Sequence, residues 1–574
     1  MDRNSSASSP PVDSPTAATS PAARDGAGST PSGDRPNLNL AALHEAVAAA
    51  VPERECLVWR HRRLSWSQVA ARTRRLANVL RDAGLGVHRP FSALAGWESG
   101  QDHLAIYLHN GNEYLEAMLG AFKARVAPVN INYRYVAEEL SYVLGDAGAR
   151  GIVFHSRFAP VLAEVLPGLN PVALLLQVPD ESGHDLLTGA QWYEESLAAA
   201  SPELPDELVA AWSGNDLYIL YTGGTTGMPK GVLWRQADFA AAALGVRVES
   251  PDAAAAAAPR VKLRTLPCAP FMHGAAHWNA LSAWVAGGTV VIQSEVTKLD
   301  PVDIWSTAAN ERVTALQIVG DAFARPLLDE LSANRDRYDL SSLRHLLTGG
   351  AILSPANKAA FIELLPGVTL VDVLGSSESG RQGMVQGVAS VFDPSPTARV
   401  LSEELDRVLS PGDPTAGWLA MSGPVPRGYL GDPAKSARSF PVVEGVQYSV
   451  PGDRALWLAD GAVELLGRDS VTINSGGEKI FAEEVEQAVK SHPSVADAVV
   501  VGRPSQRWGQ EVVAVVQLRP DRQRDDAALL EEAGRHIARY KLPKEFVYVE
   551  RVVRSPSGKT DYRWAREAAG PGKT

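Results

Sequence analysis

Apolar and polar positions along the chain follow two spacings, one typical of helices and one typical of buried strands. Within 66–83 the apolar residues recur at helical intervals, which predicts a helix, and Gly84 predicts its end. Short apolar runs of strand length then alternate with further helical patterns. The expected strands are 105–109, 126–131 and 151–154, and the expected helices between them are 112–124 and 136–147.

The same alternation continues through the middle of the chain and determines the expected fold class. Further strands are expected at 217–221, 289–293, 313–319 and 344–348. Strands that alternate with helices favour an α/β fold with layered, mostly parallel sheets. Six consecutive alanines at 253–258 lie between two prolines. We interpret them as a surface excursion, with a short helix as the alternative.

The pattern changes near residue 470 and predicts a second, smaller α+β unit. Its expected helices are 483–490 and 526–540, and its expected strands are 496–501, 511–518 and 546–550. Residues 1–36 contain almost no large apolar side chain, so we expect a disordered tail there. The expected organisation is this tail, a large domain (37–469), a small mobile domain (470–565) and a C-terminal tail (566–574).

Composition narrows the class of protein. Hydrophobic residues make up 45% and charged residues 21% of the 574 positions, as in globular proteins. The net charge of -11 argues against nucleic-acid binding, which needs clustered basic residues. The two cysteines, Cys56 and Cys268, form no metal-ligand pattern and favour a reducing compartment. Since neither a membrane-spanning run nor a signal-peptide pattern is found, we expect a cytoplasmic protein.

The strongest chemical signal is the segment 221–231, which reads YTGGTTGMPKG. Its glycines let backbone N–H groups approach an anion closely, because no Cβ lies in the way. Its threonines add hydroxyl donors, and Lys230 adds a positive charge. Directly after a buried strand, this combination predicts a site for the phosphates of a nucleotide. A flexible turn without a ligand is the alternative.

Signatures of two other enzyme classes are excluded by spacing. The segment 221–231 lacks the Walker A pattern GxxxxGK[ST], and the Gly-Lys-Thr at 558–560 has Val553 where that pattern needs a glycine. The glycines of the segment 375–380 stand one residue too far apart for the nucleophile elbow of a hydrolase.

The segment 221–231 resembles the phosphate-binding signature of the adenylate-forming superfamily, which includes acyl-CoA synthetases, peptide-synthetase adenylation domains and luciferases. Further motifs resemble those of the family and follow in its order, so that the match runs from about residue 38 to 565. These motifs are 270–274, 348–351, 374–378, 452–453, 467–468, 476–486 and 557–559.

The resemblance implies a reaction in two steps, with ATP, Mg²⁺ and coenzyme A. A carboxylate first attacks the α-phosphorus of ATP to give an acyl-adenylate, and the CoA thiol then displaces AMP. The implied catalytic residues are Lys559, Glu378 and His273, and the implied Mg²⁺ ligands are Glu378 and Thr222. For His273, a purely structural role is the alternative, and for Lys559 an exposed lysine without function.

The resemblance also assigns binding residues to each substrate. It implies ATP binding by Thr222, Gly223, Gly224, Thr225, Thr226, Gly227, Lys230, Gly349, Gly350, Ala351, Ser377, Asp453 and Arg468. It implies CoA binding by Gly476, Gly477 and Lys479, and a hinge at Ser470, about which the small domain rotates between the two steps. Departures from the family pattern at Gly223, Leu374 and Ser470 remove no charged group.

The acid substrate is expected to be bulky and apolar. Gly375 stands where short-acid members of the family carry a bulky aromatic residue, which implies an open acyl pocket. His273, Gly274 and Ala275 are expected to line its other side. The segments 123–135, 221–235, 270–278, 319–326 and 473–481 look like bacterial acyl-CoA synthetases that activate steroid side-chain acids. A steroid side-chain acid is therefore our first hypothesis, and a medium- or long-chain fatty acid the second.

Two functions of other classes remain as alternatives. An adenylation enzyme that loads a carrier protein would not depend on CoA. A non-catalytic ligand-binding relic would have lost charged residues, whereas Lys230, Glu378, Asp453, Arg468 and Lys559 are all present. The expected partners are small molecules, without nucleic acid or a transmembrane segment, and homodimerisation is left open.

Overall fold

A computed structural model of the chain describes residues 38–224, 227–351, 353–387, 392–468, 471–475, 478–505, 509–537, 539–555 and 558–571. The predicted disorder of residues 1–36 lies outside this part of the chain. No helix among the described residues combines the length and the apolar character needed to cross a lipid bilayer.

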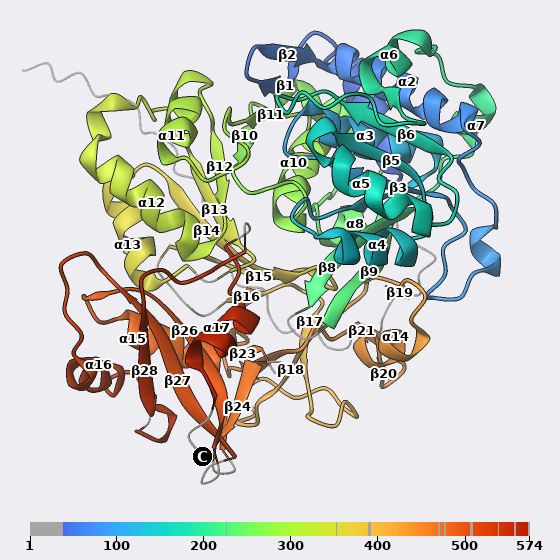
Figure 1. Ribbon diagram of the computed structural model, residues 1–574. Coiled ribbons are helices and arrows are strands. Elements are labelled where there is room, and N and C mark those ends of the chain that lie inside the picture. Colours follow the sequence, from blue (N-terminus) through green and yellow to red (C-terminus); the bar gives the residue numbers. More distant parts are fainter. Residues whose placement is uncertain are drawn as a thin grey trace, which may run out of the picture. The chain divides into compact units, whose positions relative to one another are not determined.

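Two large sheets with mostly parallel strands form the N-terminal α/β domain, as predicted (Figure 1). The nine-stranded sheet has parallel strands at its centre and antiparallel strands at both edges. In spatial order its strands are β16 (Asp393–Pro394), β15 (Gly380–Gln386), β14 (Thr369–Ser376), β13 (His345–Gly349), β12 (Ala315–Ile318), β10 (Arg264–Pro267), β11 (Thr289–Ile292), β1 (Glu55–Trp59) and β2 (Arg62–Ser65).

The eight-stranded sheet is built in the same way, with its antiparallel pairs at one edge. Its order is β19 (Gly428–Tyr429), β9 (Gly227–Arg235), β8 (Leu217–Gly224), β4 (Ala127–Asn130), β3 (His103–Tyr107), β5 (Ala149–His155), β6 (Leu174–Val178) and β7 (Gln191–Trp192). The parallel strands are buried on both faces, which explains why they read as continuous apolar runs in the sequence.

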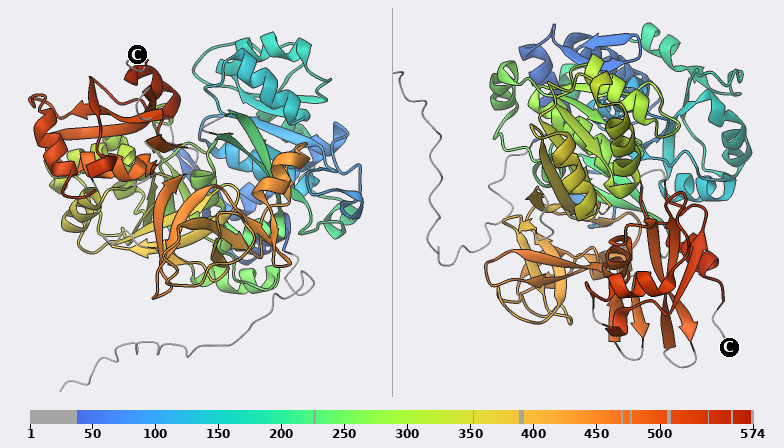
Figure 2. Two further views of the ribbon diagram at one scale, coloured as in Figure 1. Left: turned by 90° about the horizontal axis from the view of Figure 1, so that it is seen from below. Right: turned by 90° about the vertical axis from the view of Figure 1, so that its left-hand side faces the viewer.

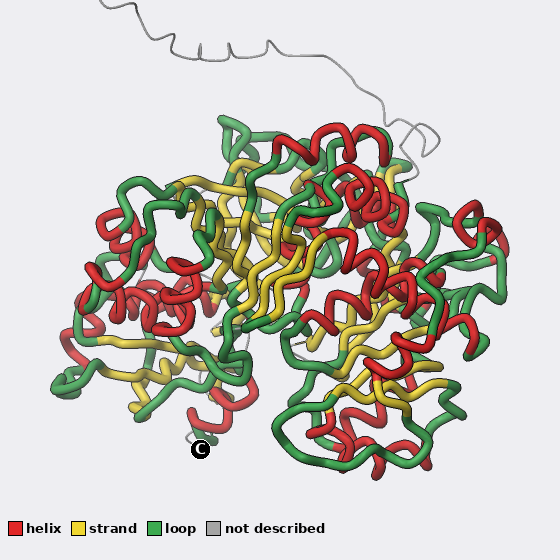
Figure 3. The backbone as a smooth tube through the Cα atoms, turned by 90° about the horizontal axis from the view of Figure 1, so that it is seen from above, coloured by secondary structure: helices red, strands yellow, loops and turns green. Residues whose placement is uncertain are grey.

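Helices pack between the two large sheets and on their outer faces (Figure 3). The central helices are α2 (Trp66–Asp82), α3 (Asn112–Ala124) and α10 (Gly274–Ala286), whose apolar residues share one core with both sheets. Ser65 and Gln68 form a capping box at the start of α2, which explains why the predicted helix begins there. The further helices of the domain are α1 (Leu40–Ala50), α4 (Ala137–Asp146), α5 (Ala159–Val165), α6 (Tyr193–Ala199), α7 (Asp206–Ala210), α8 (Gln236–Ala242), α11 (Pro301–Asn310), α12 (Gly320–Ala333), α13 (Pro355–Leu364) and α14 (Pro433–Ser439).

The alanine run forms the helix α9 (Pro251–Ala257) rather than a surface excursion. Ser250 caps it by accepting a hydrogen bond from the Ala253 backbone N–H, and Ala254 and Ala258 are buried. The short-helix alternative is therefore the correct one.

The sequence did not predict a third, antiparallel sheet with several small apolar clusters. It consists of β17 (Ala398–Leu401), β18 (Gly417–Ser422), β20 (Val442–Val443), β21 (Val446–Ser449), β22 (Asp453–Trp457) and β23 (Val463–Arg468).

The small C-terminal α+β domain is drawn at the red end of the colour scale in Figure 2. It has a hydrophobic core of its own, formed by residues between Val471 and Ala569. Its strands are β24 (Thr472–Ser475), β25 (Glu478–Phe481), β26 (Val495–Ser505), β27 (Gly509–Leu518) and β28 (Glu545–Val549), and its helices are α15 (Ala482–Lys490), α16 (Asp526–Ala533) and α17 (Tyr562–Ala569). The helix predicted at 526–540 is shorter, since α16 ends at Ala533 before Gly534. Helix α17 continues past the boundary expected at residue 565.

Candidate active site

The phosphate-loop segment forms a β-hairpin, not a strand followed by an open loop. Strand β8 continues to Gly224 and β9 returns antiparallel to it, with Thr222 opposite Lys230 and Gly224 opposite Gly227. Only the backbone of Gly223, Gly224 and Gly227 is described, and the predicted donors Thr225 and Thr226 lie outside the described residues.

Asn130, at the end of β4, fastens this hairpin to the segment that precedes α10. Its amide oxygen accepts a hydrogen bond from the Tyr221 backbone N–H at 2.7 Å. Its amide nitrogen donates to the carbonyl oxygens of Tyr221 at 3.0 Å and of Met272 at 2.8 Å. One buried side chain therefore sets the spacing between the predicted phosphate site and the predicted carboxylate site.

Replacing Asn130 with leucine is expected to lower the free energy of unfolding by about 3 kcal/mol, because three buried backbone groups lose their partners. The KM for ATP should rise, since the hairpin is no longer held. Urea unfolding and initial-rate kinetics measure the two effects. The exposed Asn334→Ala change serves as the control, and an unchanged KM for ATP would show that Asn130 does not position the hairpin.

Lys230 lies half-buried between two carboxylates. Its Nζ is 4.0 Å from Oδ1 of Asp146 and 3.9 Å from Oδ2 of Asp432. Burial lowers the pKa of Lys230, but the hydrogen bond to Tyr142 and the charge of Asp146 outweigh it, so the net shift is upward. The side chain is thus a stable cation with only distant ion-pair partners, which suits an anionic ligand.

The turn between β14 and β15, which carries Glu378, is anchored from neighbouring strands. Tyr429 donates its hydroxyl hydrogen to Oε1 of Glu378 at 3.0 Å, and Ser449 donates to the Glu378 carbonyl oxygen at 2.6 Å. Trp234 in β9 donates to the Ser377 carbonyl oxygen at 2.9 Å. The Glu378 carboxylate is therefore fixed in place.

The residues around Glu378 fit a magnesium ion that is shared with phosphates. Mg²⁺ in nucleotide sites takes one or two carboxylates and completes its shell with phosphate oxygens and water. Glu378 supplies one such carboxylate, and Thr222 in the hairpin is the other ligand that the sequence predicted. No cluster of three or more His, Cys, Asp or Glu side chains suited to an all-protein metal site occurs among the described residues.

His273 is held neutral at the start of α10. Burial, followed by the charge of Lys559, lowers its pKa to about 3. Its Nε2 atom is buried and makes no hydrogen bond to any described residue. A neutral imidazole with a vacant nitrogen can bind a carboxylate or a carbonyl oxygen, but its low pKa makes it a weak base at neutral pH.

Buried neutral histidines predict a loss of stability in acid. Burial is the main cause that lowers the pKa of His273 and His155 to about 3 and that of His109 and His277 to about 4. Because the unfolded chain binds these protons near pH 6.5, this stability is present above that pH. It falls as the pH drops towards 4, by about 1.4 kcal/mol per pH unit for each histidine.

Urea unfolding at pH 7.5, 6.0 and 5.0 measures this acid sensitivity. The His155→Gln change should reduce the fall in the free energy of unfolding by the contribution of one histidine. The His61→Gln change, at an exposed histidine, should leave the pH dependence of the free energy of unfolding unchanged. A free energy of unfolding that is constant between pH 7.5 and 5.0 would contradict the assignment of neutral buried histidines.

The structure places Lys559 beside the predicted adenine loop. Gly558 has φ +75°, and a Cβ on it would lie 2.9 Å from the Val319 carbonyl oxygen, so this loop packs against the start of α12. Lys559 Cε lies 4.0 Å from the position that a Cβ on Gly350 would take. Since the Lys559 charge also lowers the His273 pKa, three predicted site residues that are distant in sequence lie together.

The loop that carries Lys559 is organised by an ion pair within the C-terminal domain. Arg554 contacts the two oxygens of Asp497 at 2.6 and 2.7 Å and donates to Oγ1 of Thr560 at 2.9 Å. A second ion pair, at 3.6 Å between Lys490 of α15 and Asp321 of α12, joins the C-terminal domain to the large domain.

The remaining predicted ATP and CoA residues are described to different extents. Gly349 ends β13, Gly350 has φ +83°, and Ala351 follows. Asp453 begins β22 opposite Arg468 of β23 and is buried. The side chains of Arg468 and Lys479 are not among the described ones, and Ser470, Gly476 and Gly477 lie outside the described residues.

The backbone of the β14–β15 hairpin explains why residue 375 is a glycine, and the sequence alone does not reveal this reason. A Cβ at this position would lie 2.5 Å from the Gly380 carbonyl oxygen, so the β14–β15 hairpin itself requires glycine. The absence of a side chain here is thus no measure of pocket size. On the other side, a Cβ on Gly274 would meet Trp278 and Leu220 at 3.2 and 3.3 Å.

A chain of hydrogen bonds under the His273 segment was also missed. Trp278 donates to the Tyr218 hydroxyl at 3.0 Å, that hydroxyl contacts Nε2 of His277 at 2.5 Å, and Nδ1 of His277 contacts the Phe271 carbonyl oxygen at 2.6 Å. Burial lowers the pKa of His277 to about 4, so it is neutral. A buried polar residue in an apolar run, such as Asn130 or His277, was the signal available in the sequence.

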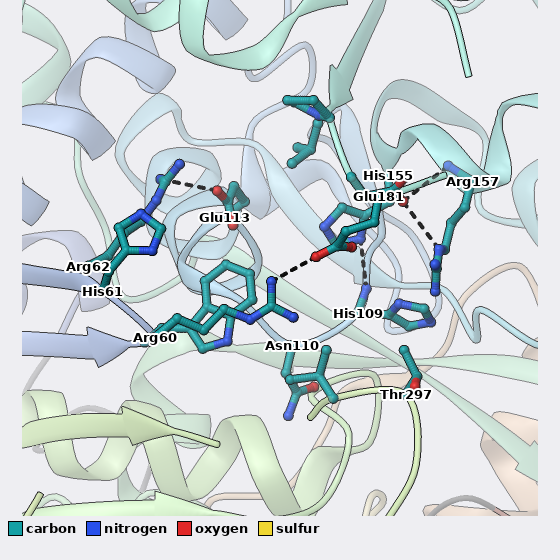
Figure 4. Close-up of a pocket in the computed structure, with 15 residues that line it drawn as sticks. Arg60, His61, Arg62, His109, Asn110, Glu113, His155, Arg157, Glu181 and Thr297 are labelled. Carbon is teal, nitrogen blue, oxygen red and sulfur yellow. Dashed lines mark hydrogen bonds and ion pairs between the residues drawn. The ribbon is translucent and has the colours of Figure 1, made fainter. Parts of the chain in front are cut away.

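A cavity of about 180 Å³ lies away from these residues (Figure 4). Charged and histidine side chains line it, among them Arg60, Glu113, His155 and Glu181. Asn110 connects it to the active-site segment, because its amide bonds to the Ala269 carbonyl oxygen and the Phe271 N–H. None of the predicted site residues lines it.

Sequence comparisons identify the family. A model of the AMP-binding enzyme family matches residues 44–430, and one of the AMP-binding enzyme C-terminal domain matches residues 484–559. The medium-chain acyl-CoA ligase Mig of Mycobacterium avium is 50% identical over 93% of this chain and 98% of its own. The 3-oxocholest-4-en-26-oate–CoA ligase of Rhodococcus rhodochrous is 37% identical over 93% and 96%.

Solved structures agree on the fold. The anthranilate CoA ligase AuaEII in complex with anthranoyl-AMP matches with a TM-score of 0.77 at 20% identity, over 93% of this chain and 97% of that one. ATP-bound MatB from Rhodopseudomonas palustris matches with a TM-score of 0.76 at 22% identity, over 92% and 98%. The chain therefore belongs to the AMP-binding enzyme family of adenylate-forming enzymes and is an acid–thiol ligase of that family.

Proposed function

We propose that this chain converts a bulky apolar carboxylic acid, in the first place a steroid side-chain acid, into its CoA thioester. The observation that carries the proposal is the position of Lys559 beside Gly350 and His273. A cation fixed there stabilises the negative charge that develops around the α-phosphate when the carboxylate attacks.

The proposed reaction has two steps, adenylation and thioester formation. A carboxylate oxygen forms a bond to the α-phosphorus, and the bond from that phosphorus to the bridging oxygen breaks, so that pyrophosphate leaves. The CoA sulfur gives its proton to solvent and attacks the acyl carbon, the bond from that carbon to the phosphate oxygen breaks, and AMP leaves with the bonding electron pair. In this scheme Lys230 and the hairpin bind the departing phosphates, and neutral His273 orients the carboxylate.

The requirement for Mg²⁺ forms part of the proposal and rests on Glu378. The fixed Glu378 carboxylate and the Thr222 hydroxyl would hold the ion, which would offset the charge of the ATP phosphates. A cytoplasmic location belongs to the same proposal, since ATP and CoA are available there. Sedimentation analysis decides between the monomer and the homodimer.

The acyl group is inferred from the relatives and from α10. The compared relatives are named for medium-chain acids and for 3-oxocholest-4-en-26-oate, and both classes are apolar acids. Ala275, Trp278 and Ser282 are partly exposed and lie on one face of α10, which leads away from His273. A medium- or long-chain fatty acid is the second candidate.

The test is an assay of purified protein with ATP, Mg²⁺ and acids from acetate through palmitate to steroid side-chain acids. AMP release and acyl-CoA are followed with and without CoA. CoA-dependent thioester formation from bulky acids supports the proposal. Turnover of linear acids alone would leave the reaction standing and remove the steroid assignment. Acyl-adenylate without thioester would indicate a carrier-loading enzyme, and no reaction with any acid a non-catalytic relic.

A further inference from the structure

Arg381, near the start of β15, is a partly buried cation that has no partner within the described ranges of the chain. Its guanidinium makes no hydrogen bond, ion pair or ring contact with any residue that the structure describes. Burial lowers its pKa, and the charge of the nearby Arg247 lowers it further. Two cations thus stand close together, and neither is paired with a carboxylate of the residues that the structure describes.

Several other partly buried arginines have a carboxylate partner, whereas Arg325 of α12, like Arg381, makes no ion pair with a described residue. Each of three others contacts a carboxylate within 3 Å: Arg72 with Glu116, Arg125 with Asp216 and Arg554 with Asp497. A partly desolvated guanidinium without an acceptor is unfavourable, and a second cation nearby makes it more so. The Arg381 site is therefore complementary to an oxygen acceptor that the described part of the chain does not supply.

The position of Arg381 relates it to the acyl side of the site. It pairs with Gly375, a predicted acyl-binding residue, across the β14–β15 hairpin. Its guanidinium packs against Gly245, where a Cβ would collide with it, and Gly245 has φ +68°. The residue before that glycine, Leu244, accepts a hydrogen bond at its carbonyl oxygen from Ser282 of α10 at 2.9 Å.

The length of helix α10 gives the distance between His273, at the carboxylate end of the site, and Ser282, near Arg381. Ser282 follows His273 by nine residues, which corresponds to about 13 Å along a helix. The partly exposed face with Ala275, Trp278 and Ser282 runs between these two points. A ligand with its carboxylate at His273 that lies along this face would bring its far end near the Arg381 guanidinium.

We propose that Arg381 is a specificity-determining residue, which binds an oxygen acceptor at the end of the acid that is remote from the carboxylate. The substrate class is then a bulky acid with a distal keto or similar oxygen, not a plain hydrocarbon acid. This inference rests on the proposed function. One of the compared relatives is named for an acid of this kind, which carries a 3-oxo group.

The test compares matched acids with Arg381→Met, which keeps an unbranched apolar side chain and removes the charge. The acids are a 3-oxo steroid side-chain acid, its 3-deoxy analogue and palmitate. We expect kcat/KM for the 3-oxo acid to fall about 10- to 100-fold, mainly through KM. The values for the other two acids should change less than about threefold, as for substitutions without a lost partner. Arg335→Met, at an exposed arginine, is the control.

Several outcomes would overturn the inference without touching the proposed function. These are an equal loss for the 3-oxo and 3-deoxy acids, no loss for either, or a wild-type enzyme that does not prefer the 3-oxo acid. If no acid is turned over at all, the proposed function fails separately. Calorimetric binding of the 3-oxo and 3-deoxy acids to both proteins then still decides whether Arg381 recognises the distal oxygen.

Discussion

Replacing Lys559 with alanine is expected to slow acyl-adenylate formation by about 100- to 1,000-fold. Lys559 stands beside Gly350 and lowers the pKa of His273 by its charge, so it acts where the carboxylate and the α-phosphate are expected to meet. In the second step the acyl carbon is attacked rather than the phosphorus, and we expect the rotated small domain to have withdrawn Lys559 from the departing AMP. Thioester formation from supplied acyl-adenylate should therefore change little.

The two half-reactions can be measured separately. Exchange of labelled pyrophosphate into ATP reports the first step, and consumption of synthetic acyl-adenylate with CoA reports the second. Lys298→Ala, at an exposed lysine, controls for general effects of removing a positive charge. Equal losses in both steps would mean that Lys559 supports the structure and does not act in adenylation, and no loss would remove it from the site.

Periodicity was sufficient for elements that pack against large apolar clusters. Helices α2 and α3 and strands β3, β5 and β8 overlap the predicted positions, because the helices pack on one large cluster and the strands alternate between that cluster and a second one. The short strands between residues 398 and 468 share several small clusters instead. Their apolar runs are too short to be distinguished from loops, which explains why the third sheet was missed.

The motifs predicted which residues come together in the site. They did not predict the residues that hold these in position. Lys559, Gly350 and His273 were identified from three separate motifs, and the structure brings them together. Asn130 holds the segment before His273 and Tyr429 holds Glu378, and both side chains reach these motifs from other strands. Such contacts join positions that are remote along the chain, so no local pattern records them.

Gly375 shows how a motif residue can mislead. A glycine in place of a bulky residue suggested free space, but the carbonyl oxygen of Gly380 occupies the position that a side chain would need. The same hairpin carries Arg381, which the sequence analysis did not consider. Substrate selection can therefore depend on a charged neighbour of the motif rather than on the glycine within it.

Arg554→Met is expected to lower both the stability of the protein and the rate of adenylation. Asp497 loses the guanidinium that contacts both of its oxygens, and its side chain is only 18% exposed. Leaving a largely buried carboxylate unpaired costs about 3 kcal/mol of unfolding free energy. Arg554 also donates to Thr560, so the loop that presents Lys559 loses one of its internal hydrogen bonds.

A double-mutant cycle separates these two effects. Adding Asp497→Leu to Arg554→Met removes the unpaired charge and should recover part of the stability, as measured by urea unfolding. It does not restore the bond to Thr560, so adenylation should stay slow. Arg551→Met, at an exposed neighbour, is the control. Full recovery of adenylation in the double mutant would show that Arg554 serves only to neutralise Asp497. Persistent slow adenylation in a stable protein would instead identify Arg554 as the residue that positions Lys559 for the first step.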